Sequence, residues 1–384
     1  MKLNLLIISL LFATCCSNYN SAKIISEKEP YEIIDVSKFW DAPKYRFRKE
    51  SIEIEKVIHL ETNDISVLSN IREIEFSKNY IYILDRYQNG SVAIFSSDGH
   101  FVNRVKQGAG PEEISAGISI FFDDDNDCLL IYDCQGNKLS KYSPEGEYIS
   151  NIYVQGGLTD FSVVDTDILY VQPTAISSNS TYVKLMDSIA AEKSVWDLGQ
   201  DPMPCLLPKC LYKSDNGVAI TQVFSNTAFL YQNNDISKYF TIIGPNTDFS
   251  NIQSLEDMNK KMSDDEYCFS GEMLESKDFR ELKFDFPHWN QKTIFQSRKT
   301  GEIWQLQFDD NESVLSYIII KGVYSYENNT FWGLIYPEDY VRLRGPGWDK
   351  QENNPLISPG DMEKLRNVKP DDNPIIVLFK LKDE

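Results

Sequence analysis

The stretch "IYILDRYQNGSVAIFSSDGHFVNRV" (81–105) returns in altered form as "LLIYDCQGNKLSKYSPEGEYISNIYV" (129–154), with Asp133 standing 48 residues after Asp85. Each copy predicts an apolar strand that ends in Asp, a polar turn, an alternating strand, an acidic-Gly hairpin turn and another strand. A repeat of this length is typical of a β-propeller blade. Because one such sheet cannot bury both of its faces alone, neighbouring copies must pack against each other.

Weaker copies of the same unit follow along the chain. Counting from Ile71 gives six blades, with centres near residues 85, 135, 175, 222, 297 and 335. The stretches "NIQSLEDMNKKMSDDEY" (251–267) and "PGDMEKLRNVKP" (359–370) have apolar residues at helical spacing and predict short helical insertions. The expected fold is therefore an all-β, six-bladed propeller with short helices inserted between its strands.

Two strands outside the repeat predict how the ring closes. The segment "IEIEKVIHL" (52–60) is a free alternating strand before the first blade, and "IIVLFKLK" (375–382) stands near the end of the chain. If both lie in the last blade, the N- and C-terminal strands pair and leave no open sheet edge there.

The N-terminus predicts export. Lys2 precedes an apolar run of about 11 residues, too short for the roughly 20 helical residues that span a bilayer. The small residues and cysteine that follow resemble the lipobox of bacterial lipoproteins, in which the cysteine is acylated. Cys15 is the preferred lipid-attachment residue and Cys16 the alternative, while an ordinary cleaved secretory peptide is the competing interpretation.

These features divide the chain into three parts. They are a lipoprotein signal peptide (1–14), a lipid-anchored tether and N-terminal extension (15–50), and the propeller (51–384). The expected location is the cell envelope, with the membrane face left open. The 38 basic and 58 acidic residues give a formal charge of -20, which argues against a nucleic-acid partner.

The glycines of "GAGPEE" (108–113) invite comparison with a phosphate-binding loop. A dinucleotide loop needs a third glycine where Glu113 stands, and a Walker loop needs Gly-Lys-Ser/Thr. Glu112 and Glu113 would also repel a phosphate. The stretch therefore predicts a chain reversal, and no cofactor is expected.

Metal ligands are also scarce in the sequence. The chain has three histidines and no zinc spacing, so no metal is expected. The acidic run Asp123–Asp127 lacks the ligand spacing of an EF-hand loop, and a solvated turn explains it. Cys205 and Cys210 could form a disulfide around Pro208 or remain thiols.

Together, the signal, "IYILD", "VAIFSSDG", "GAGPEE" and "NPIIVLFKLK" resemble the six-bladed β-propeller lipoproteins of Bacteroidota, relatives of NHL-type propellers. The resemblance covers nearly the whole mature chain and implies that "GAGPEE" enters the second blade. Some six-bladed propellers are lactonases or lyases with a metal in the central channel. Asp85 and Asp133 could face such a channel together, but hydrogen bonds to their own turns are the favoured explanation, because a structural role predicts repetition in each blade.

Aromatic and basic residues gather late in the chain, and exposed Trp and Tyr rings bind sugars and peptide segments. The predicted binding residues are Trp289, Trp348, Arg280 and Arg342. The expected function is an envelope-anchored, non-enzymatic binding module for a protein, peptide or glycan. The alternative is a propeller hydrolase or lyase with a channel metal.

Overall fold

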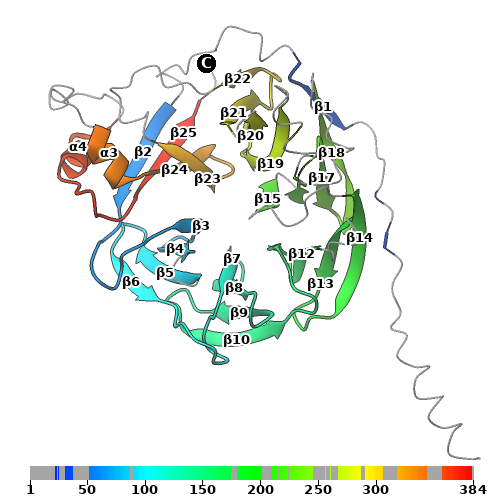
Figure 1. Ribbon diagram of the computed structural model, residues 1–384, viewed down its shortest axis with the longest axis horizontal. Helices are drawn as coiled ribbons and strands as arrows, with labels where there is room; N and C mark the ends of the chain where they lie inside the picture. The colour runs from blue at the N-terminus through cyan, green and yellow to red at the C-terminus, as the bar shows by residue number, and fades with distance from the viewer. Residues whose placement is uncertain are drawn as a thin grey trace, which may run out of the picture.

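The computed structural model describes residues 22–23, 25, 31–37, 52–86, 90–173, 180–200, 209–214, 217–223, 225–244, 256, 260, 267–286, 290–305, 318–343 and 357–382. Within these residues the chain forms one five-stranded and five four-stranded sheets, arranged in a ring around an axis (Figure 1). The expected six-bladed, all-β propeller is confirmed.

Within each blade the strands are ordered from the axis to the rim, with the first strand of the blade innermost (Figure 1). Blade 1 contains β3 (Ile71–Phe76), β4 (Tyr80–Asp85), β5 (Ser91–Ser96) and β6 (Phe101–Arg104). Blade 2 contains β7 (Gly117–Asp123), β8 (Cys128–Asp133), β9 (Lys138–Tyr142) and β10 (Tyr148–Tyr153). Blade 3 contains β11 (Asp160–Val164), β12 (Asp167–Pro173), β13 (Ser180–Met186) and β14 (Glu192–Gln200).

The other three blades follow the same order from axis to rim. Blade 4 contains β15 (Leu211–Ser214), β16 (Gly217–Ile220), β17 (Thr227–Gln232), β18 (Asp235–Ile243) and β1 (Glu32–Asp35). Blade 5 contains β19 (Cys268–Glu275), β20 (Phe279–Phe286), β21 (Asn290–Ser297) and β22 (Ile303–Gln305). Blade 6 contains β23 (Ile319–Ser325), β24 (Thr330–Ile335), β25 (Ile375–Leu381) and β2 (Ile52–His59).

The apolar strands are explained by burial on both faces. In β4, Tyr82 and Leu84 belong to the core shared with blade 2, whereas Ile81 and Ile83 belong to the core shared with blade 6. Successive side chains of a strand point to opposite faces, so a blade packed on both sides needs a continuous apolar run. The hydrophobic core is therefore a series of layers between neighbouring blades.

The ring closes as the sequence predicts. Strand β2 pairs antiparallel with β25, and its register runs from Ile52 opposite Leu381 to His59 opposite Ile375. Ile58 of β2 is buried in the core between blades 6 and 1. The N-terminal strand thus supplies the rim of the last blade.

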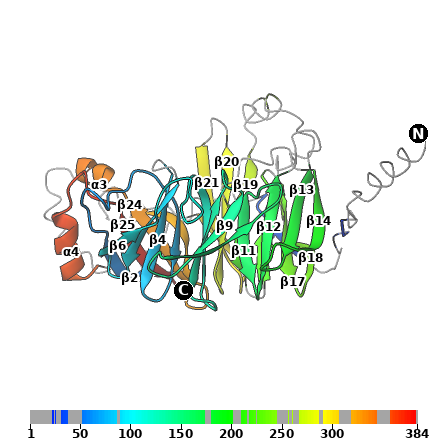
Figure 2. The ribbon, with the colours of Figure 1, turned by 90° about the horizontal axis from the view of Figure 1, so that it is seen from below.

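Two helices cover the outside of the ring at blade 6, α3 (Pro337–Leu343) and α4 (Pro359–Arg366) (Figure 2). Helix α4 is the predicted insertion, and the side chain of Ser358 caps it by accepting the N–H of Asp361. Helix α3 is not predicted by the sequence analysis. The other helical candidate, 251–267, falls almost wholly outside the described residues.

The N-terminal extension takes part in the fold. Strand β1 adds in parallel to β18 as the fifth strand of blade 4, with Glu32 opposite Phe240. Lys23 forms a parallel bridge with Trp196 of β14. The sequence of this part of the chain predicts an extension, and neither pairing is expected from it.

Candidate functional site

The axis of the propeller carries a group of charged side chains. Lys209 lies two residues before the start of β15 in blade 4. Its Nζ lies 3.7 Å from Glu73 and 3.4 Å from Glu75, both on β3 of blade 1. Blades 1 and 4 stand on opposite sides of the ring (Figure 1). Lys209 therefore links the two sides of the propeller across its axis.

Buried hydrogen bonds complete a circuit around this half of the ring. Glu73 accepts the N–H of Ile120 in blade 2 at 2.8 Å. Ser119 of the same strand donates to Asp160 of blade 3 at 3.2 Å. Asp160 in turn accepts the N–H groups of Cys210 and Leu211 in blade 4, each at 2.8 Å. We call Glu73, Glu75, Asp160 and Lys209 the axial cluster.

Burial sets the protonation of the axial cluster. Burial raises the pKa of Glu73 to about 7, although Lys209 opposes this shift. The pKa values of Glu75 and Asp160 are raised for the same reason, with Lys209 again opposing. Burial alone would lower the pKa of Lys209, but Glu75, Glu73 and Asp160 raise it above its ordinary value. Lys209 is therefore the cation of the cluster at neutral pH.

This arrangement bears on the channel-metal hypothesis. Carboxylates from two blades do converge at the axis, but the cation among them is the ammonium of Lys209. Across the described part of the chain, no group of three or more His, Cys, Asp or Glu side chains is arranged to hold a metal ion. The axial cluster thus has the composition of a structural ion-pair network.

A second charged group lies between blades 5 and 6. Lys283 of β20 forms a 2.8 Å ion pair with Glu272 of β19. Glu281 is 1% exposed, its Oε2 has no hydrogen-bond partner, and burial raises its pKa to about 7. Lys321 of β23 has a lowered pKa because of burial and the nearby charge of Lys283.

The repeated aspartates are structural. Asp85 accepts hydrogen bonds from the N–H and hydroxyl of Ser69, and Asp133 accepts the same two bonds from Ser115. Both aspartates are fully buried. Each one fastens the segment that enters its own blade, so its repetition follows from the blade structure. The structure favours this interpretation over a shared channel site.

The "GAGPEE" loop joins β6 to β7 and so enters blade 2, as predicted. Lys138 of β9 donates from Nζ to the carbonyl oxygens of Gly110 (3.1 Å), Pro111 (3.2 Å) and Glu113 (2.7 Å). The N–H of Gly110 donates to the carboxylate of Glu113 at 3.0 Å. The carbonyl oxygens of the loop therefore surround the lysine ammonium. An anion-binding loop would instead present backbone N–H groups to its ligand.

The acidic turn after β7 also uses its side chains internally. Asp123 accepts the N–H groups of Asp125 (3.2 Å) and Asn126 (3.1 Å) and the side-chain amide of Asn126 at 2.8 Å. These bonds form the turn, in agreement with the prediction from the sequence.

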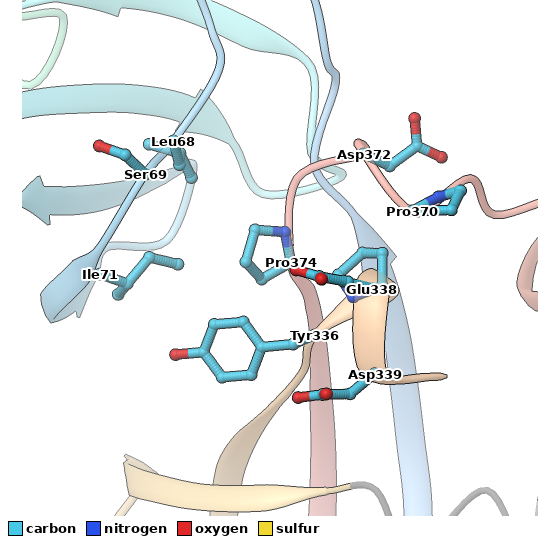
Figure 3. A pocket seen from close by; sticks show the side chains of 10 residues that line it. Leu68, Ser69, Ile71, Tyr336, Glu338, Asp339, Pro370, Asp372 and Pro374 are labelled. Atoms are coloured by element: carbon cyan, nitrogen blue, oxygen red, sulfur yellow. The ribbon is translucent and has the colours of Figure 1, made fainter. Parts of the chain in front are cut away.

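A hollow of about 200 Å³ lies at the junction of blades 6 and 1, and we call it the α3 pocket. It is lined by Leu68, Ser69, Ile71, Tyr336, Pro337, Glu338, Asp339, Pro370, Asp372 and Pro374. In Figure 3 the ring of Tyr336 lies among these residues, with Leu68, Ser69 and Ile71 to one side. Carboxylates and prolines form the remaining wall.

Hydrogen bonds hold the walls of the α3 pocket together. Asn373 is buried, and its Oδ1 accepts the N–H of Leu68 at 2.8 Å. Its amide group donates to the carbonyl oxygens of Glu61 (2.8 Å) and Ser66 (3.1 Å). Segments more than 300 residues apart are thus fixed against each other. Two wall segments of the pocket, 68–71 and 370–374, are therefore held against each other by the fold itself.

The sequence-predicted binding residues have different environments. Arg280 is 1% exposed, pairs with Glu275 and Glu32 at 2.8 Å each, and packs over the ring of Phe240 at 4.5 Å. A guanidinium in this position holds strands together, so the placement of Arg280 at a binding surface is corrected. Arg342 is exposed on α3 and pairs with Asp339 of the pocket at 2.6 Å.

The other predicted residues cannot be placed. Trp289, Trp348, Cys15 and Cys16 lie outside the described residues, as does Cys205 of the open disulfide question. The axial cluster and the pocket residues Glu338 and Asp372 are not predicted from the sequence. The stretch "IREIEF" contains a signal for the axial cluster, because Glu73 and Glu75 alternate with apolar residues on an inner strand.

Six blades closed by an N-terminal strand define the chain as a six-bladed β-propeller. The family model DUF4934, described as a domain of unknown function, matches residues 33–380, so the chain belongs to this family. The comparison with curated proteins finds no match. Among the described residues, no helix has the length and apolar character needed to cross a membrane.

Two solved structures from Bacteroides share the fold. A protein of Bacteroides fragilis NCTC 9343, described as exported, is 16% identical with a TM-score of 0.69. The alignment covers 91% of this chain and 100% of that protein. A DUF4221 member from Bacteroides vulgatus is 11% identical with a TM-score of 0.51, over 88% of this chain and 100% of that one. At these identities the likeness concerns the fold.

Proposed function

We propose that the protein is an exported, lipid-anchored β-propeller that acts as a non-enzymatic binding module for a protein, peptide or glycan. The α3 pocket is its proposed contact site. The observation that carries this proposal is a preorganised hollow whose walls come from three distant segments of the chain. Preorganisation favours binding because the free protein does not have to order these segments first.

The size and chemistry of the pocket limit what it can hold. About 200 Å³ is below the roughly 300–1,000 Å³ of sites that enclose a drug-sized ligand. The pocket therefore suits one side chain or one sugar ring that protrudes from a larger partner. Its lining contains the carboxylates of Glu338, Asp339 and Asp372 and the phenol ring of Tyr336. Asp339 also pairs with Arg342, and Asp372 accepts the N–H of Lys369. A group that donates hydrogen bonds or stacks on an aromatic ring fits this lining.

The axial cluster supports a binding module over a channel-metal hydrolase or lyase. In the axial cluster, Lys209 pairs with Glu73 and Glu75, carboxylates of the kind that such an enzyme would direct at its metal. The aspartates that repeat between blades are engaged in buried hydrogen bonds. The charged residues nearest the axis therefore stabilise the ring.

Export and anchoring rest on the N-terminal sequence. The short apolar run and the cysteines after it support cleavage and acylation at Cys15. The description of the Bacteroides fragilis protein as exported supports an envelope location for this chain as well.

Site-specific photo-crosslinking tests the binding proposal. A photoreactive amino acid replaces Glu338 on the exposed side of the pocket, and in a control protein it replaces Glu147, which is exposed on blade 2. After irradiation of intact cells, we expect a discrete adduct from position 338 that is absent from position 147. Equal adduct patterns at the two positions, or none at either, would contradict a partner at the pocket.

A further inference from the structure

The N-terminal extension is fastened to the rim of blade 3. The N–H of Lys23 donates to the carbonyl oxygen of Val195 at 2.8 Å. Its Nζ donates to Ser194 at 2.8 Å and lies 4.8 Å from the ring centroid of Trp196. These three residues belong to β14, the outermost strand of the blade. Lys23 is thus held by both its backbone and its side chain.

Strand β1 then fastens the extension to blade 4 and blade 5. Ile34 and Val36 are buried in the core between these blades. The carboxylate of Glu32 accepts hydrogen bonds from Arg280 and Gln296 of blade 5, each at 2.8 Å. The extension is therefore part of the folded propeller and does not act as a free linker at these positions.

The chain between the proposed lipid and the first fastened residue is short. Cys15 and Lys23 are eight residues apart. A fully extended chain spans at most about 3.3–3.6 Å per residue, so this segment reaches roughly 26–29 Å. Lys23 can lie no farther than this from an acylated cysteine at the membrane surface.

We infer that the rim of blades 3 and 4 faces the lipid bilayer and that the α3 pocket faces away from it. The inference rests on the proposed lipid anchor at Cys15. Strands β14 and β18 lie at the opposite end of the molecule from α3 and α4 (Figures 1 and 2). A short anchor on one side of the ring places the pocket on the side that is open to a partner.

The exposed aliphatic side chains of this rim suit contact with the boundary between lipid headgroups and acyl chains. Ile189 on the β13–β14 turn is 82% exposed, and Ile33 on β1 is 59% exposed. The net charge of -20 opposes approach to anionic lipids, so the covalent lipid must hold the rim at the surface. A bilayer of zwitterionic lipid is the partner that this rim best accommodates.

Fluorescence quenching tests the orientation. The full-length protein is purified from membranes and placed in phosphatidylcholine vesicles that carry a headgroup quencher. A fluorescent amino acid is introduced at Ile189 on blade 3 or, for comparison, at Glu363 on the exposed face of α4. We expect several-fold stronger quenching at position 189. Equal quenching at both positions, or stronger quenching at 363, overturns the inferred orientation.

Two further variants separate the orientation from the anchor. Inserting about 20 Gly/Ser residues after Asn20 adds a flexible coil. The quenching at positions 189 and 363 should then become equal, while the protein still floats with the vesicles. A difference that survives this insertion shows that the short anchor does not set the orientation. Replacing Cys15 and Cys16 with Ala should abolish flotation. If that variant still floats, or if the unmodified protein does not float, the lipid anchor fails and the orientation fails with it.

Discussion

Lys209 in blade 4 lies 3.7 Å from Glu73 in blade 1, so one ion pair spans the axis of the propeller. The same ammonium lies 3.4 Å from Glu75. Neighbouring blades pack against each other through apolar layers, whereas this ion pair joins opposite blades. The pair should therefore stabilise the ring as a whole.

Replacing Lys209 with Met should destabilise the protein, because two carboxylates at the axis lose their cation. Removing one partner of a fully buried pair costs about 3–5 kcal/mol, and the 38% exposure of Lys209 reduces the expected loss to about 1–3 kcal/mol. Urea unfolding measures the change. The double variant Lys209→Met/Glu73→Gln should recover part of the loss, and a single variant as stable as the wild type would contradict a structural role for the pair.

The buried carboxyl of Glu281 should make stability depend on pH. Its pKa is about 7 in the folded protein, because of burial, against an ordinary value of 4.5. Between these values the folded state binds more protons than the unfolded state, so the stability contributed by this group falls as pH rises. Glu281→Gln should therefore match the wild type near pH 4.5 and exceed its stability by up to about 3 kcal/mol at pH 8.

Unfolding curves at several pH values check this prediction for Glu281. Glu363→Gln, a change on the exposed face of α4, serves as the control and should leave the pH dependence unaltered. If Glu281→Gln and the wild type respond to pH in parallel, Glu281 is not a buried carboxyl of raised pKa.

The two glycines of the "GAGPEE" loop should differ in their tolerance of alanine. Gly108 has a φ of +153°, and a Cβ there would lie 1.9 Å from the carboxylate of Glu113. At Gly110 the corresponding distance is 3.1 Å, and the φ is not positive. Gly108→Ala should cost more than about 1 kcal/mol, and Gly110→Ala should cost less. Thermal unfolding of the two variants measures both stability losses. A larger loss for Gly110→Ala than for Gly108→Ala would contradict the loop geometry.

The sequence predicts the fold well because the blade is a local unit. Each predicted element can be recognised within one short stretch of sequence. The structure confirms the strands that end in Asp85 and Asp133, the hairpin turns and the two closing strands. Strand β1 is missed because it has four residues and its partner β18 lies more than 200 residues away. Local pattern cannot show that such a short segment adds to a distant sheet.

The candidate sites are harder to predict for the same reason. Lys209 and Glu73 are 136 residues apart and meet because the ring brings opposite blades to one axis. The α3 pocket combines three segments, and α3 itself is a seven-residue helix without a clear apolar period. Arg280 is predicted as a binding residue because it belongs to the late group of aromatic and basic residues. Its partner Glu32 lies on the unexpected strand β1, so local sequence does not show that the guanidinium is buried.

The dissociation constant of the partner captured from position 338 tests the central claim most directly. It is measured for the wild type, for Glu338→Gln/Asp339→Asn in the pocket, and for Lys209→Met at the axis. Binding through the α3 pocket predicts at least a tenfold weaker complex for the pocket variant, about 1.4 kcal/mol, and an unchanged constant for Lys209→Met. An unchanged constant for the pocket variant together with weaker binding by Lys209→Met would contradict the account and place the contact at the axis.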